Sequence, residues 1–276
     1  VKTLIFLFQL RPKIVFVQSP PSFALLFVYL YCLLVNGRFV VDAHSDAMLA
    51  PYWTRPQWLY RFLARQAVTT IVTNEHFQQQ IRSWGGHGFI LRDIPTTFSR
   101  SETYPFQGAF NVVVVNTFAE DEPLAEILAA ATELENVHFY VTGKKRADDQ
   151  PIPGPVSANV HFTDFLPNED YYALLAGCQA VMCLTTRNHT MQRGACEALS
   201  LGKPIITSDW PLLRTYFHKG TVHVDNTTAG IEQGVTAMMQ EYGRYQSGIK
   251  QLQTEQQQEW QNKISLLAEL IQQSLR

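Results

Sequence analysis

Short apolar runs alternate with helical segments along most of this chain. The runs 13–18, 38–42 and 69–73 each have the length of one strand, and helical stretches such as 56–67 separate them. Strands divided by helices are typical of a parallel sheet, because parallel neighbours need a long crossover connection. The first part of the chain is therefore expected to be an α/β domain.

A second series of the same kind follows residues 94–108, which lose the periodicity and gain Pro, Ser and Thr, as linkers do. The pattern predicts helices at 123–134, 168–177, 191–201 and 210–217, and strands at 111–116, 137–142, 159–162, 179–184, 204–207 and 221–224. The fold class is α/β, with two doubly wound, Rossmann-like domains.

We place the domains at residues 1–100 and 108–276, the second with C-terminal helices of which the last packs one apolar stripe. The chain opens on Val1 inside an apolar helix rather than on Met. We therefore expect the N-terminal domain to be truncated.

Composition excludes several classes of protein. With 46% hydrophobic and 17% charged residues, the chain is globular, and a net charge of -2 without a basic run argues against nucleic acid as a partner. The four cysteines lack the spacing of a zinc site or a disulfide framework, which favours the cytoplasm. The apolar run 23–35 is shorter than the roughly 20 residues of a membrane span, so we expect a buried helix, with peripheral membrane contact as the alternative.

Open parallel sheets bind ligands at the carboxyl ends of their strands, so the polar residues there are the candidates. Asp42 ends the strand at 38–42, and His44 and Ser45 come directly after it. His44 has a titration range that suits an acid or base, or a hydrogen-bond donor to a sugar hydroxyl. The alternative is a histidine that caps a helix or is satisfied in the core.

Two further strand ends in the second domain carry groups that bind anions. Gly143 allows close approach of the backbone, and Lys144 or Lys145 is then placed to meet a phosphate, although Gly-Lys is also an ordinary turn. The start of the predicted helix 191–201 offers free amide groups, and Arg187 and Arg193 add positive charge there.

Glu197 lies one to two turns inside this helix, too deep to cap it. A carboxylate at such a place is suited to accept hydrogen bonds from the vicinal diol of a ribose, as an acid does in dinucleotide sites. The alternative is a solvated helix glutamate.

The stretch "HTMQRGACEALSLGKPIITSD" resembles the nucleotide-sugar motif of GT-B glycosyltransferases, especially glycosyltransferase family 4. In that family two glutamates with seven residues between them precede a helix, a Gly-Lys-Pro turn and a strand. Glu197 and the turn at 202–204 match, whereas His189 stands at the place of the first glutamate. The resemblance implies donor contacts from Thr190, Met191, Arg193 and Gly194, and His189 either replaces the glutamate as a donor to sugar or phosphate or lies in a loop.

The N-terminal half is similar to a second group. "VQSPPSFALLFVYLYCLLVNGRFVVDAHS" resembles a segment of the chitobiosyl-diphosphodolichol beta-mannosyltransferases, inverting enzymes that use GDP-mannose. The resemblance implies acceptor binding by Gln18, Pro20, Pro21 and Ser45, and catalytic roles for Asp42 and His44.

The loop "NTFAEDEP", residues 116–123, lacks the Arg and Lys with which family 4 enzymes hold the diphosphate. The resemblance implies that the backbone amides of Thr117 and Phe118 bind the diphosphate, together with Lys144, Arg193 and the start of the helix.

The expected function follows from both likenesses. The chain would be a GT-B glycosyltransferase with two domains facing a cleft, moving a sugar from a UDP- or GDP-sugar to a glycan, lipid-linked or other acceptor on the cytoplasmic side. No metal and no cofactor are expected, because a helix dipole and basic side chains stabilise the departing diphosphate. A GT-B nucleotide-sugar epimerase and a noncatalytic sugar-nucleotide-binding subunit are the alternatives.

Overall fold

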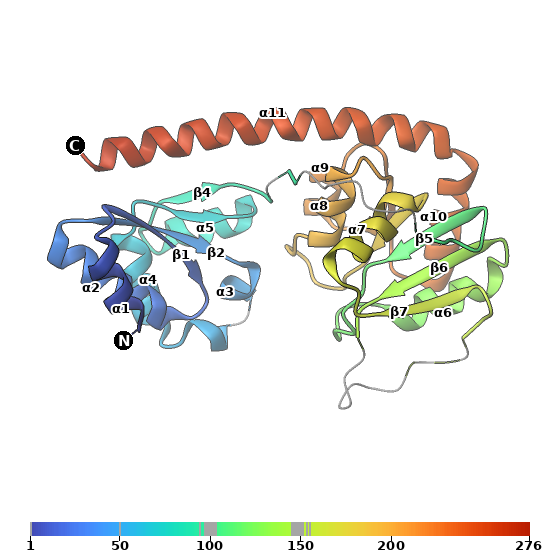
Figure 1. The fold of residues 1–276 in the computed structure, drawn as a ribbon, viewed down its shortest axis with the longest axis horizontal. Coiled ribbons are helices and arrows are strands. Elements are labelled where there is room, and N and C mark those ends of the chain that lie inside the picture. The colour runs from blue at the N-terminus through green and yellow to red at the C-terminus, as the bar shows by residue number, and fades with distance from the viewer. Residues whose placement is uncertain are drawn as a thin grey trace. The chain divides into compact units, whose positions relative to one another are not determined.

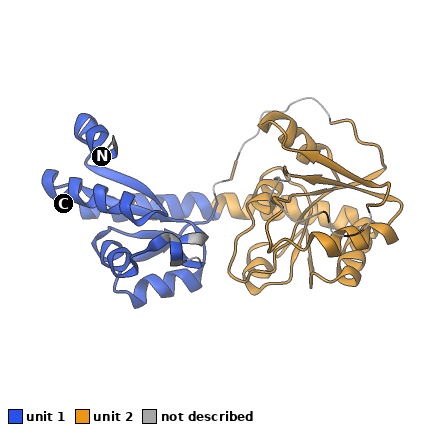
Figure 2. Cartoon of the chain, turned by 90° about the horizontal axis from the view of Figure 1, so that it is seen from below, with its two compact units in different colours: residues 1–93, 259–276 blue, residues 94–258 orange. Residues whose placement is uncertain are grey.

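The computed structural model describes residues 2–49, 51–93, 95–96, 104–144, 152, 154 and 156–276 (Figure 1). The chain divides into two compact units (Figure 2). Unit 1 contains residues 1–93 and 259–276, and unit 2 contains residues 94–258. The predicted linker 94–108 is described only at 95–96 and 104–108, and Lys145 lies outside the described residues.

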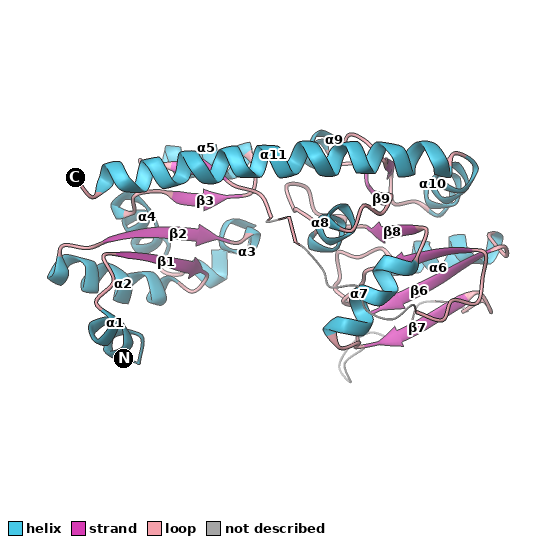
Figure 3. Ribbon diagram, turned by 45° about the horizontal axis from the view of Figure 1, so that its top comes forward, coloured by secondary structure: helices cyan, strands magenta, loops and turns pink. Residues whose placement is uncertain are grey.

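Unit 1 is built on a four-stranded parallel sheet of order β1-β2-β3-β4 (Figure 3). The strands are β1 (Ile14–Ser19), β2 (Arg38–Ala43), β3 (Thr70–Val72) and β4 (Gly88–Ile90). The helices are α1 (Lys2–Leu10), α2 (Ser22–Val35), α3 (Ser45–Leu49), the 3-10 turn η1 (Pro51–Thr54), α4 (Gln57–Gln66) and α5 (Glu75–Ser83). Buried apolar residues of α2 and α4 form one core with those of β2, which lies inside the sheet.

Unit 2 has a six-stranded parallel sheet of order β10-β9-β8-β5-β6-β7. Its strands are β5 (Phe110–Val114), β6 (Val137–Thr142), β7 (Val160–Asp164), β8 (Ala180–Cys183), β9 (Ile205–Ser208) and β10 (Thr221–Val224). Its helices are α6 (Leu124–Glu133), α7 (Asn168–Gly177), α8 (Arg193–Ser200), α9 (Pro211–Tyr216) and α10 (Thr228–Gln240). β5 and β8 are wholly buried, as strands with helices on both faces of a sheet must be.

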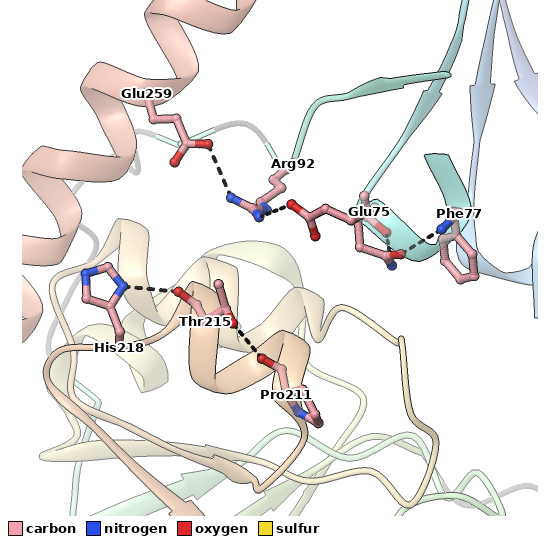
Figure 4. Close-up of polar contacts among 9 residues, drawn as sticks. Glu75, Phe77, Arg92, Pro211, Thr215, His218 and Glu259 are labelled. Carbon is pink, nitrogen blue, oxygen red and sulfur yellow. Dashed lines mark hydrogen bonds and ion pairs between the residues drawn. The ribbon is translucent and has the colours of Figure 1, made fainter. Parts of the chain in front are cut away.

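The last helix, α11 (Tyr242–Ser274), contributes its first part to unit 2 and its second part to unit 1. In unit 1, Leu267 packs in one cluster with Val40 of β2 and Ile71 of β3. Arg92 is held by Glu259 of α11 at 3.2 Å and by Glu75 of α5 at 3.5 Å (Figure 4).

This packing changes the expected division of the chain. The sequence assigned everything after residue 108 to the second domain, whereas the structure groups residues 259–276 with unit 1. The physical reason is the apolar stripe of α11, whose Leu267 is 4% exposed against the first sheet. A stripe at helical spacing shows that a helix packs, but it does not show which sheet receives it.

The two doubly wound α/β sheets confirm the predicted fold class, and strands lie where each alternating apolar run was placed. Two helices were not predicted. α3 has only five residues, too few to show a period. α10 contains two glycines, although Thr227 caps it by accepting the N–H of Gly230 at 3.0 Å.

Two histidines lie side by side on neighbouring strands of unit 2. Nδ1 of His138 on β6 and Nε2 of His161 on β7 are 2.9 Å apart, and the rings are nearly parallel. Burial lowers the pKa of His161, and the adjacent His138 lowers it further. Burial also lowers the pKa of His223 on β10.

These shifts make stability depend on pH. Between the unfolded pKa of 6.5 and the lower folded pKa, the unfolded chain binds more protons than the native chain. The free energy of unfolding is therefore expected to fall as pH drops through 6.5, and the loss is complete below the folded pKa. Urea denaturation at several pH values measures this, and His161→Phe should flatten the dependence while the exposed His76→Gln should not. An unchanged slope in His161→Phe would contradict the assignment.

Candidate functional site

The order of strands in unit 2 marks one position for a ligand. β6 and β7 continue from β5 in one direction, whereas β8, β9 and β10 continue in the other. The switch point therefore lies between β5 and β8, and in open α/β sheets ligands bind beyond the carboxyl ends of the strands at such a point. Two loops leave there, residues 115–123 after β5 and residues 184–192 after β8.

Helix α8 begins close to the ends of these strands. A Cβ added to Gly194 would lie 2.8 Å from Cγ1 of Val115 and 2.9 Å from Sγ of Cys183, so only glycine permits this approach. The residues that precede α8, His189, Thr190 and Met191, lie in the loop after β8, and His189 adopts a left-handed φ of 62°. The four residues that the sequence assigned to donor binding at the start of this helix therefore lie at the switch point of the sheet.

Glu197 of α8 accepts two hydrogen bonds. The hydroxyl of Tyr171 on α7 donates to Oε2 at 2.8 Å, and Nε of Arg193 donates to Oε1 at 3.1 Å. Burial, and then the negative charge of Glu197, raise the pKa of Tyr171, so this hydroxyl stays protonated and keeps donating. The side chain of Glu197 is 12% exposed, whereas that of Arg193 is 82% exposed. Glu197 is a fixed carboxylate rather than a solvated one.

The loops after β5 and β8 are joined by Asp121. Its Oδ2 accepts from the hydroxyl of Thr185 at 2.7 Å, its Oδ1 lies 3.4 Å from Arg187, and its carbonyl accepts the N–H of Thr186 at 2.8 Å. The carbonyl of Thr185 in turn accepts from Trp210 Nε1 at 2.9 Å. These bonds hold both loops in one arrangement.

The amides of Thr117 and Phe118 have acceptors inside their own loop. The N–H of Thr117 donates to Oε2 of Glu122 at 2.7 Å, and the N–H of Phe118 donates to Oδ1 of Asn116 at 2.9 Å. Burial raises the pKa of Glu122, while hydrogen bonds from Thr117 and Ala119 act to lower it. A phosphate that used these two amides would first have to displace protein acceptors.

The loop after β6 meets the loop after β5 at Gly143. This glycine has a φ of +94°, and a Cβ there would lie 2.2 Å from the carbonyl oxygen of Asn116. Lys144 follows directly and is exposed. Gly143 and Lys144 thus lie at the carboxyl edge of the sheet, next to the switch point, as the sequence predicted.

In unit 1 the structure brings Gln18 and His44 together. The side-chain amide of Gln18, near the end of β1, donates to Nε2 of His44, which follows β2. The backbone N–H of His44 donates to the carbonyl of Ser19 at 3.0 Å, and this fixes the exposed imidazole at the carboxyl edge. His44 is therefore neither a core histidine nor a helix cap through its ring.

The other predicted residues of unit 1 lie at the same edge. Asp42 pairs with Gln18 in the register of β1 and β2, and burial raises its pKa while His44 acts to lower it. Pro20 and Pro21 connect β1 to α2, and Ser45 begins α3. Together with Gln18 and His44, these four residues lie at one edge of one sheet.

Sequence reasoning missed the residues that hold the site. Tyr171 lies on α7 among other aromatic and acidic residues, and no local signal separates it from them. Asp121 and Glu122 were noticed only as part of an acidic loop. The acceptor role of Asp121 depends on a contact with a loop 64 residues away, and that of Glu122 depends on how its own loop folds.

Among the described residues, no three His, Cys, Asp or Glu side chains gather in a way that could hold a metal ion. None of the described helices is long and apolar enough to cross a membrane.

The sequence matches the model of a glycosyl transferase-like family over residues 122–263. No curated protein sequence matches the chain. Similar solved structures include Anabaena HepE in complex with UDP, with a TM-score of 0.76, 13% identity, and coverage of 99% of this chain and 81% of that chain.

Sucrose-phosphate synthase from Thermosynechococcus elongatus has a TM-score of 0.70 at 12% identity, covering 98% of this chain and 75% of that chain. A protein described as a putative UDP-N-acetylglucosamine 2-epimerase from Listeria monocytogenes has a TM-score of 0.63 at 12% identity. The similarity covers 90% of this chain and 71% of that chain. At these identities the likeness concerns the fold.

Proposed function

Because the chain belongs to the glycosyl transferase-like family, we propose that it moves a sugar from a nucleotide diphosphate sugar to an acceptor. Its fold is GT-B, with two Rossmann-like α/β units. In this proposal unit 2 binds a UDP- or GDP-sugar, and unit 1 binds a glycan, a lipid-linked sugar or another acceptor. The observation that carries the proposal is the fixed carboxylate of Glu197 at the switch point of unit 2.

Glu197 is assigned to the ribose of the donor. Each carboxylate oxygen can accept two hydrogen bonds, so Tyr171 and Arg193 leave capacity on both oxygens for a diol. The likeness in fold to a structure that is described as a complex with UDP supports this assignment.

The diphosphate is assigned to the α8 side of the switch point. The candidates are the start of α8, His189, Thr190, Arg193 and, from the β6 loop, Lys144, because amides at a helix start and nearby cations favour an anion. Gly194 lets the helix start lie directly on the strand ends. The amides of Thr117 and Phe118 are left out of this assignment, since both already have acceptors.

The acceptor is assigned to the carboxyl edge of unit 1. His44 would take the proton of the attacking hydroxyl or donate to the sugar, with Gln18 orienting its ring and Asp42 beside it. An inverting outcome with GDP-mannose, as in the chitobiosyl-diphosphodolichol group, remains a proposal that rests on the similar N-terminal segment.

The second candidate is a nucleotide-sugar epimerase, which the similarity to the Listeria structure favours. An epimerase changes the donor sugar without any acceptor, so its product has the mass of the substrate. A noncatalytic subunit would bind the nucleotide sugar but would change neither the donor nor the acceptor.

The test is a panel of UDP- and GDP-sugars, first in calorimetry and then with glycan and lipid-linked acceptors followed by mass spectrometry. Transfer increases the acceptor mass by one sugar residue. An isomerised donor with unchanged acceptor would favour the epimerase, and absence of binding across the panel would contradict the proposal.

The proposed reaction needs no metal ion. If a helix dipole and basic side chains carry the charge of the departing diphosphate, the transfer rate should be unchanged in EDTA. The measurement is a rate with and without the chelator, with Mg²⁺ restored as the control. A rate that falls in EDTA and recovers with Mg²⁺ would contradict metal independence.

We also propose a peripheral contact with the cytoplasmic face of a membrane through α2. This helix exposes Phe23, Leu30, Leu33 and Leu34, and α1, α2 and α4 contain no Asp or Glu. Exposed apolar side chains on helices without carboxylates suit the interface of a membrane.

Replacing Leu33 and Leu34 with serine is expected to lower binding to vesicles with anionic lipid by about tenfold, because each leucine loses the free energy of burial. Sedimentation with vesicles measures the bound fraction. Leu266→Ser on α11, which is 53% exposed, is the matched control. Equal binding of the wild type and the double variant would contradict the contact.

A further inference from the structure

The loop between β5 and α6 contains a carboxylate, that of Glu122, which accepts hydrogen bonds from the loop itself. The N–H groups of Thr117 and Ala119 donate to Oε2 of Glu122 at 2.7 and 3.1 Å, and the hydroxyl of Thr117 donates to Oε1 at 3.0 Å. Three donors that converge on one acidic group form the kind of concave backbone site, or nest, that binds phosphate in other proteins.

The shape of this nest is fixed by groups other than Glu122. Phe118, between the two donors, has a left-handed φ of 60°, which is uncommon for a bulky residue. Its N–H donates to Oδ1 of Asn116 at 2.9 Å, and its ring stacks on Phe162 at 6.4 Å between centroids. These contacts hold the backbone turn, so the donors keep their direction when the carboxylate is removed.

The charges around the nest oppose a second anion. Residues 115–123 contain Glu120, Asp121 and Glu122 but no Lys or Arg. Asp121 engages Arg187 from the loop after β8, and this cation is therefore shared with a carboxylate. A phosphate beside Glu122 would be repelled by like charges a few ångströms away.

We propose that Glu122 is a built-in occupant of an anion-binding nest, which closes the loop after β5 to phosphate groups and so restricts where a diphosphate can bind in unit 2. The restriction of the donor rests on the proposed function, whereas the nest and its occupant do not. Without the carboxylate, two N–H groups and one hydroxyl lose their acceptor, and a phosphate or diphosphate group is the ligand that replaces it.

The experiment follows the backbone amides of Thr117 and Ala119 by NMR in the full chain during titration with inorganic pyrophosphate. In Glu122→Ala both amides should shift in a saturable way, with an apparent Kd at least about tenfold below that of the wild type, which corresponds to one hydrogen-bonded charge. Glu122→Gln keeps the size of the side chain and has an amide oxygen that can accept the same N–H groups, so it should still occupy the nest and behave as the wild type. The matched control is Glu120→Ala, an exposed carboxylate of the same loop, which should behave as the wild type.

The proposal would be overturned if both amides of the wild type shifted in a saturable way and the wild type bound pyrophosphate as tightly as Glu122→Ala. It would equally be overturned if Glu122→Ala did not bind pyrophosphate at these amides, or if Glu122→Ala unfolded while Glu122→Gln did not, because the nest would then depend on the Glu122 side chain for its shape. The readout needs no donor and no acceptor. Failure of the transferase assay therefore leaves this result intact, and failure here leaves the transferase assay to be judged separately.

Discussion

Replacement of His44 with asparagine is expected to lower kcat of sugar transfer by about 10²- to 10⁴-fold, the usual contribution of a general acid or base. The exposed ring is held at the carboxyl edge of unit 1 by Gln18 and by the bond from its own N–H to Ser19. Asparagine keeps a polar side chain but cannot accept and release a proton near neutral pH. KM for the donor should change little, since His44 is not assigned to donor binding.

The pH dependence of kcat/KM distinguishes the loss of a proton-transfer group from a structural effect of the substitution. If His44 is the general base, the wild-type kcat/KM should depend on pH, and His44→Asn should lose that dependence. His76→Gln, an exposed histidine of the same unit, is the matched control and should keep both the rate and the profile. A His44→Asn variant with more than about a tenth of the wild-type kcat would contradict a role in proton transfer.

Replacement of Glu197 with alanine is expected to weaken binding of UDP and GDP by roughly 13- to 160-fold. Hydrogen bonds to a charged group contribute about 1.5–3 kcal/mol, and the loss of the carboxylate also leaves the hydroxyl of Tyr171 without its acceptor. The measurement is calorimetry with the nucleotide alone, so that the acceptor and the chemical step do not enter.

A second variant distinguishes the carboxylate from its support. Tyr171→Phe keeps Glu197 but removes the donor that orients it, so nucleotide affinity should fall by about tenfold, less than in Glu197→Ala. Unchanged affinity of Glu197→Ala for both UDP and GDP would contradict the assignment of Glu197 to the ribose. Equal losses in both variants would show that Glu197 acts through packing rather than through contact with the nucleotide.

The positions that could be predicted from the sequence are those that depend only on residues nearby in the chain. Gly143, Gly194 and the residues after each strand were placed correctly at the sheet edge, because strand ends and helix starts leave a pattern in neighbouring residues. The same local logic placed His44 after β2. It did not show that Gln18 would meet it, although Gln18 lies in β1 and His44 directly follows the adjacent β2.

The contacts that the sequence did not reveal either join distant segments or depend on how a loop folds. Tyr171 reaches Glu197 across 26 residues, and Asp121 reaches Thr185 across 64. The amides of Thr117 and Phe118 appeared available in the sequence because a backbone N–H carries no sign of its acceptor. Only the folded loop shows that Glu122 and Asn116 accept from them. Likewise, the apolar stripe of α11 indicated burial without showing that its second half belongs to unit 1.

The most direct test of the account is a crystal structure of the chain with UDP or GDP bound. We expect the ribose hydroxyls within about 3 Å of the Glu197 carboxylate, and the phosphates on the α8 side of the switch point, away from Thr117 and Ala119. A nucleotide bound in unit 1, or one whose ribose lies far from Glu197, would contradict it.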